Sequence, residues 1–220
     1  MVQRVAIGAG LAWIAGGWAY WRRVTRAATL LTALLLLLTL LATGVGSFRI
    51  GSVVLSITAV FYLAMIAQWC SKLDDPAALA SLRDLGPLTG KSRLWCLAGF
   101  AGATTLGRDL LSNTMAVFSH AASWTHLGLY FLLVNMLALL AVMALWLAPA
   151  LVVQGGCPPL QAMKLSLLAT LRHLLPCLLF SMLAFVLCIV AVIPVGFGLL
   201  VALPTLACAS FCASQDVFAT

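Results

Sequence analysis

Long runs of apolar residues, separated by short polar stretches, fill most of the chain. A helix needs about 20 apolar residues to cross the hydrocarbon core of a bilayer, because each residue rises only about 1.5 Å. Most of the runs reach or approach that length, and one is shorter. The pattern predicts about six membrane-spanning helices, over residues 27–45, 51–69, 94–107, 127–147, 174–193 and 195–212.

Three other segments are predicted to lie along the membrane surface. Residues 5–21 are rich in Gly, Trp and Tyr and precede the cations Arg22, Arg23 and Arg26. Trp and Tyr favour the interface, so a surface helix is expected, with a first span as the alternative. Residues 76–85 and 159–173 have an amphipathic pattern, which is typical of a helix half-sunk in the interface. Segment 159–173 has an apolar stripe, a cationic stripe and a small polar stripe, the last formed by Ser166, Thr170 and His173.

The short run 94–107 contains Gly99, Ala103 and Gly107, which fall at i, i+4 and i+8. Small residues at that spacing allow two helices to approach closely in lipid. We therefore expect a tightly packed third span. A re-entrant or interfacial segment is the alternative, because 14 residues are short for a span.

Composition places the chain in the membrane class. Hydrophobic residues make up 64% of its 220 residues, charged residues make up 8%, and the mean hydropathy is +1.15. Soluble domains carry about 25% charged residues. We expect one all-α integral membrane domain over residues 1–220. The net charge of +7 does not indicate nucleic-acid binding, because the cations lie in small groups between apolar runs rather than on one polar face.

The distribution of Lys and Arg predicts the orientation. With the N-terminus inside, all cations except Arg49 and Arg108 fall in cytoplasmic segments. Cytoplasmic loops of membrane proteins carry the excess of Lys and Arg. Both termini are therefore predicted to be cytoplasmic.

No motif of a hydrolase, a phosphate loop or a zinc protease is present, so we expect no enzyme activity and no cofactor. His120 and His126, with Asp109, could form an outside metal site, but their spacing does not match a helical ligand pair. Cys208 and Cys212 have that i, i+4 spacing, but no second pair matches them. We interpret the cysteines as buried thiols and predict no metal site.

Two groups of residues are candidates for binding or transport. Cations near the predicted inner face could contact a lipid phosphate, with ordinary cytoplasmic charge bias as the alternative. They are Lys72, Arg83, Lys91, Lys164 and Arg172. Asn135, Pro149 and Pro204 lie within apolar runs and could line a pathway. The amide could instead bond a neighbouring helix, and the prolines could simply break their helices.

The second half of the chain carries a recognisable set of motifs. Residues 146–151 read Trp-Leu-Ala-Pro-Ala-Leu, residues 159–166 read Pro-x-x-Ala-Met-Lys-x-Ser, and residues 194–200 read Pro-x-Gly-x-Gly-Leu-Leu. The chain resembles a group of uncharacterised proteobacterial multi-pass inner-membrane proteins. The resemblance covers residues 127–218, and the first half matches less closely. It implies a bacterial inner-membrane location and carries over no biochemical activity.

The sequence therefore predicts a structural or accessory protein of the cell envelope. Its expected partners are membrane lipids and other membrane proteins. The alternative is a transporter-like or channel-like protein for a lipid or small neutral solute, since proline-broken helices are common in transporters. A mid-membrane cavity lined by Asn135, Pro149 and Pro204 would favour transport, whereas a solid core of Leu, Ala and Gly would favour the structural role.

Overall fold

A computed structural model describes residue 6 and residues 8–45, 48–73, 92–118, 124–194 and 196–218. Almost all of these residues are helical and none lies in a strand, so the predicted all-α helical bundle is confirmed. The helices are α1 (Ala9–Val45), α2 (Phe48–Leu73), α3 (Ser92–Phe118), α4 (Trp124–Trp146), α5 (Ala148–Gly155), α6 (Pro159–Arg172), α7 (Leu174–Val192) and α8 (Leu199–Phe218).

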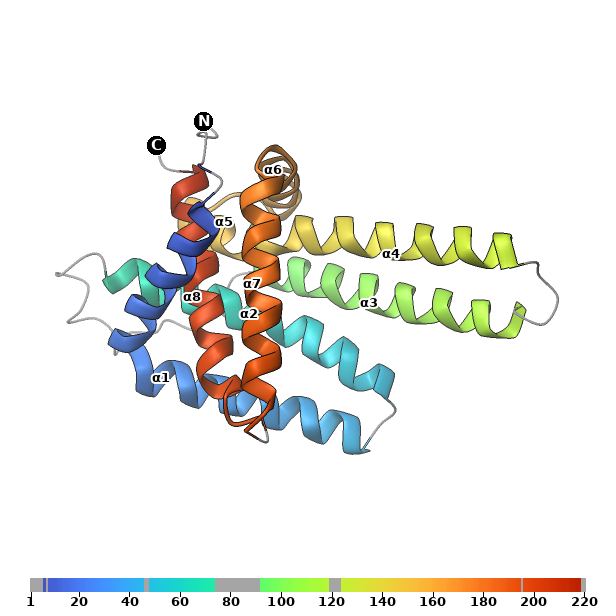
Figure 1. Cartoon of the computed structure of the whole chain (residues 1–220), viewed down its shortest axis with the longest axis horizontal. Coiled ribbons are helices and arrows are strands. Elements are labelled where there is room, and N and C mark those ends of the chain that lie inside the picture. The colour runs from blue at the N-terminus through green and yellow to red at the C-terminus, as the bar shows by residue number, and fades with distance from the viewer. Residues whose placement is uncertain are drawn as a thin grey trace.

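The helices form two sets that cross each other (Figure 1). The first part of α1 runs beside α7 and α8, and these three segments contact one another. The second part of α1 runs across them together with α2, α3 and α4. The α3–α4 pair extends beyond the rest of the molecule (Figure 1).

Five stretches are long and apolar enough to cross a membrane. They are Ala9–Gly44, Arg49–Leu73, Gly128–Gln154, Leu174–Val192 and Leu199–Phe218. Large apolar side chains remain exposed on them, such as Leu30 at 72%, Phe131 at 60% and Phe185 at 65%. Exposed apolar surface on that scale suits lipid rather than water as the surrounding medium. This is a membrane protein.

One helix, α1, contains the predicted span 27–45 and, from Ala9 on, the predicted surface segment 5–21. It bends at Val24, whose backbone angles of φ −116° and ψ 16° are not helical. The next residue, Thr25, donates its hydroxyl to the carbonyls of Trp21 and Arg22, a type of bond that bends helices. The first part of α1 is packed into the bundle, because Trp13 is only 1% exposed.

The third predicted span, 94–107, is longer in the structure. Helix α3 has 27 residues and continues through Arg108 and Asp109, which the sequence places in an outside loop. Its Gly, Ser, Thr and charged residues lower its hydropathy, so α3 is not one of the five apolar stretches. Within this longer helix, Asp109 accepts a hydrogen bond from Ser52 of α2, so its carboxylate has a partner in the bundle.

The predicted small-residue contact on this span is wrong. A Cβ atom added at Gly99 or Gly107 would meet nothing within 4 Å, and Ala103 is exposed. The face of α3 that packs on α2 contains Gly102 instead, where an added Cβ would lie 3.1 Å from Ile57. The stripe of small residues thus lies on an outer face of α3, because α2 covers a different side of the helix.

Helix α6 has nearly the predicted bounds, and its small residues face the other helices. Its buried residues are Ala162, Met163, Ser166, Ala169 and Thr170, which include most of the small polar stripe. The leucines Leu160 and Leu171 are 70% and 49% exposed. In lipid, small residues pack between helices and leucines face the chains, which explains this arrangement. The predicted surface helix 76–85 lies outside the described residues.

The last helix also extends further than predicted. The sequence ends the final span at residue 212, whereas α8 runs from Leu199 to Phe218. Ala213, Ser214 and Val217 are buried, so packing against neighbouring helices maintains the last turns. Pro204 lies inside α8 without ending it. Gly196 forms the turn before α8 with a positive φ of 81°, which glycine adopts without steric cost.

Candidate functional site

Those cations predicted to hold a lipid phosphate that the structure describes are not gathered into one site. Arg83 and Lys91 lie outside the described residues. Lys164 and Arg172 are exposed on α6, and Lys72 lies in the last turn of α2. Because α6 packs mainly on α3, α4, α5 and α7, it does not bring its cations to Lys72. Their role in lipid binding stays a prediction.

The residues proposed to line a pathway do not converge either. Asn135 is exposed on α4, and its Nδ2 donates to the carbonyl of Phe131 in the same helix, at 2.8 Å. Pro149 and Pro204 are among the most deeply buried residues, each below 2% exposure. None of the three lines either of the two grooves described below.

The helix break at Pro149 is completed by Ser166 from another helix. In a continuous helix the amide of Leu147 would bond the carbonyl of Met143. Here the Ser166 hydroxyl lies between them: it accepts from the Leu147 amide at 3.2 Å and donates to the Met143 carbonyl at 2.8 Å. Ser166 is 0% exposed. Its place in the small polar stripe was the only sign of this role in the sequence.

Two tryptophans join helices that are far apart in the sequence. The indole Nε1 of Trp13 on α1 donates to Oδ2 of Asp216 on α8, at 2.7 Å. The Nε1 of Trp146 on α4 donates to the hydroxyl of Ser210 on α8, at 2.9 Å. Both rings contact Phe180 of α7, with ring centroids 6.1 and 5.1 Å away. This cluster holds α1, α4, α7 and α8 together.

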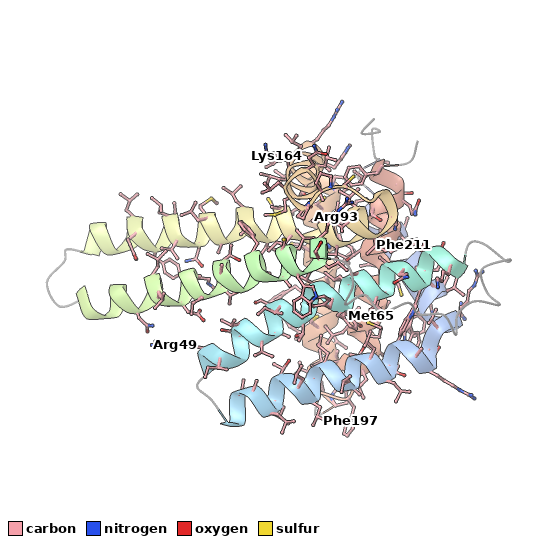
Figure 2. All side chains as sticks on the ribbon, turned by 180° about the vertical axis from the view of Figure 1, so that it is seen from behind. Arg49, Met65, Arg93, Lys164, Phe197 and Phe211 are labelled. Atoms are coloured by element: carbon pink, nitrogen blue, oxygen red, sulfur yellow. The ribbon has the colours of Figure 1, made fainter. Side chains whose placement is uncertain are left out.

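Arg93 fixes the turn between α5 and α6. Its guanidinium donates to the carbonyl of Gly156, which has a positive φ of 59° and ends α5. The backbone carbonyl at a helix end otherwise lacks a partner, so a cation there is favourable. Figure 2 shows Arg93 near the middle of the molecule, between the two crossing sets of helices.

One groove, which we call the α2–α3–α4 groove, has a volume of about 330 Å³. Its lining combines alanines and larger apolar residues with Ser56, Thr104, Thr105 and Arg108. Thr105 of α3 donates to the Ser56 hydroxyl of α2 at 2.7 Å. Four residues further along α3, Asp109 accepts from Ser52 at 2.8 Å. These two contacts pair α2 with α3 beside the groove.

A second groove, the α1–α7–α8 groove, is larger, at about 620 Å³. Leu11, Ile14 and Trp18 of α1 form one wall, and residues of α7 and α8 form the other. The one hydroxyl in its lining is that of Thr205, which donates to the carbonyl of Val201 in its own helix. The groove therefore offers mainly apolar contact.

Two cysteines meet in the core, but they are not the pair that the sequence suggests. Cys70 of α2 and Cys208 of α8 have their Sγ atoms 3.6 Å apart and are 0% and 1% exposed. No disulfide joins them. The sequence instead suggests Cys208 with Cys212, one turn along the same helix. The real pair comes from two helices that meet only in the folded bundle.

Oxidation should join these two thiols. With the other five cysteines replaced by alanine, treatment with iodine should remove one hydrogen from each sulfur and shorten the Cys70–Cys208 separation to about 2.05 Å. Mass spectrometry of peptides should then find Cys70 and Cys208 linked. A Cys70→Ala variant is the control. Recovery of both thiols unlinked would mean that α2 and α8 are not adjacent in the membrane.

The described part of the chain assembles neither of the two residue sets weighed as metal ligands, although the sequence predicts no metal site. His120 lies outside the described residues, the position of the His126 side chain is likewise not described, and Asp109 bonds Ser52. No three His, Cys, Asp or Glu side chains gather among the residues that the structure describes.

The chain was compared with known proteins. No family model, curated protein or solved structure matches it. Functional conclusions therefore depend on the residues and their geometry. The hydroxyls and indoles described above serve mainly to hold helices together, and the grooves offer contact to apolar or amphiphilic molecules.

Proposed function

We propose that this chain is a structural or accessory protein of the bacterial inner membrane, which supports the assembly of another membrane protein. The observation that carries the proposal is the packing at the helix breaks. Pro149 and Pro204 are enclosed by neighbouring helices, and Ser166 bonds the Leu147 amide and the Met143 carbonyl at the helix break before Pro149. Asn135 faces outward from α4. The two prolines and Ser166 thus belong to a packed core, and Asn135 lies away from it. Together they favour a structural role over a solute pathway.

The location and orientation are part of the proposal. The resemblance to proteobacterial inner-membrane proteins supports the location. Figure 2 shows Lys164 near one end of the molecule and Arg49 and Phe197 toward the other. The sequence puts Lys164 on the cytoplasmic side and Arg49 on the outer side, so their separation supports that orientation.

The α3–α4 pair is the proposed contact surface for a partner. It extends away from the other helices (Figure 1). On α4, Leu132, Met136 and Leu137 are 61%, 51% and 54% exposed. In lipid such a face can pack against another transmembrane helix through van der Waals contact.

Site-specific photocrosslinking in native membranes tests this role. A photoreactive residue at Leu132 or Leu137 should form an adduct with one defined membrane protein. The same residue at Leu97, which is 0% exposed, is the matched control and should form none. Removing the chain from cells should then lower the amount of that partner's assembled complex.

Two results together would favour transport instead. Photoreactive residues on α4 would form no protein adduct, and liposomes that contain the purified chain alone would take up a solute. Uptake that depends on Asn135 would be the strongest evidence against the structural role.

A further inference from the structure

The α2–α3–α4 groove has mainly apolar walls and a cation at one end. Along α3 it extends from Ala101 to Arg108, and at about 1.5 Å per residue this gives a length of about 10 Å. Alanines from all three helices keep it open, including Ala59, Ala138 and Ala141. A segment of a hydrocarbon chain has the width and polarity to lie in such a groove.

Arg108 gives the groove its charge. The neighbouring Asp109 is directed to Ser52 of α2, at 2.8 Å, and does not neutralise the guanidinium. Among the described residues Arg108 forms no ion pair, and its side chain is exposed in the groove lining. Thr104, one turn earlier on the same face of α3, adds a hydroxyl. The groove therefore favours an anionic group at the Arg108 end.

We propose that the α2–α3–α4 groove binds an anionic phospholipid, with one acyl chain along the alanines and the phosphate against Arg108. An arginine fork matches phosphate oxygens with two parallel hydrogen bonds. A helix from a second copy could also use alanine walls, but it would cover Arg108 without supplying an anion. Free phosphate would contact Arg108 but not the apolar walls. A phospholipid contacts both the apolar walls and Arg108.

Native mass spectrometry of the full chain in mild detergent tests the site. The probes are phosphatidylglycerol, which is anionic, and phosphatidylcholine of the same chain length. The wild-type chain should retain phosphatidylglycerol in preference to phosphatidylcholine. Arg108→Ala should weaken phosphatidylglycerol binding about tenfold or more, since a charge-assisted contact is lost. Arg49→Ala removes an exposed cation outside the groove and should leave binding unchanged.

A second variant tests the apolar part. Ala138→Phe should fill the groove and lower retention of phosphatidylglycerol while Arg108 is intact. Arg108→Lys keeps the charge and should therefore retain more phosphatidylglycerol than Arg108→Ala does. Far-ultraviolet circular dichroism and gel filtration check that each variant is folded.

Four results would each overturn the lipid site. Equal retention of both lipids would show that the groove does not select an anionic headgroup. Normal retention by Arg108→Ala would show that Arg108 does not hold the phosphate. A change of oligomeric mass in Ala138→Phe without loss of lipid would make the groove an interface between copies. Displacement of phosphatidylglycerol by inorganic phosphate at low concentration would make it a free phosphate site.

Discussion

Replacing Gly17 with alanine should separate α1 from α8 and greatly reduce the amount of folded protein. A Cβ atom at residue 17 would lie 2.6 Å from the carbonyl oxygen of Thr205 and 2.6 Å from the amide nitrogen of Ala209. Both are backbone atoms of α8 and cannot rotate away. Overpacking of this kind costs about 1–3 kcal/mol, and we expect the upper end of that range because whole helices must move.

The measurement is the melting temperature of detergent-solubilised protein, followed by fluorescence-detected gel filtration after heating. Gly99→Ala is the matched control, because an added Cβ there meets nothing within 4 Å and α3 is helical at that position. This control should be neutral or slightly stabilising. Equal melting temperatures for the two variants would contradict the close contact between α1 and α8.

Replacing Ser166 with alanine should destabilise the junction of α4, α5 and α6. The Leu147 amide and the Met143 carbonyl would both lose their bond to the serine hydroxyl in a buried site. Leaving buried polar groups unsatisfied costs about 1–3 kcal/mol. The free energy of unfolding, measured by titration with denaturing detergent, should fall by an amount in that range.

Ser181→Ala is the control for this variant. Ser181 is exposed on α7, and its hydroxyl donates to the carbonyl of Cys177 in the same helix at 2.9 Å. Its loss leaves a helical carbonyl that already has its backbone partner, so little change is expected. If Ser166→Ala were as stable as Ser181→Ala, the α4–α5 break would not depend on the serine bridge.

The sequence predicts the helices well where local chemistry determines their ends. Pro149 cannot continue the ladder of α4, and α5 indeed begins beside it at Ala148. Pro159 suits a first helical position, and α6 begins there. The long leucine-rich runs are also helical in the structure. The number of consecutive apolar residues depends on the segment alone, so the sequence is enough to predict them.

The sequence does not reveal which face of a helix meets which partner. Gly99 and Gly17 look alike in the sequence, since both lie among small residues in an apolar run. Only Gly17 meets another backbone, because α8 crosses α1 there. Ser166 and Arg108 show the same limit. Ser166 bonds backbone at the end of another helix, and Arg108 lines a groove between three helices. No sequence spacing describes either position.

The bond between Trp13 and Asp216 has a consequence for how the protein is made. These residues are 203 positions apart, yet they lie on helices that pack along each other. A ribosome adding about 5–20 residues per second needs roughly 10–40 s to cover that distance. Helix α1 therefore waits in the membrane until α8 arrives. A chain cut short before α8 would keep the Gly17 face of α1 open to lipid and to the cell's quality-control proteases.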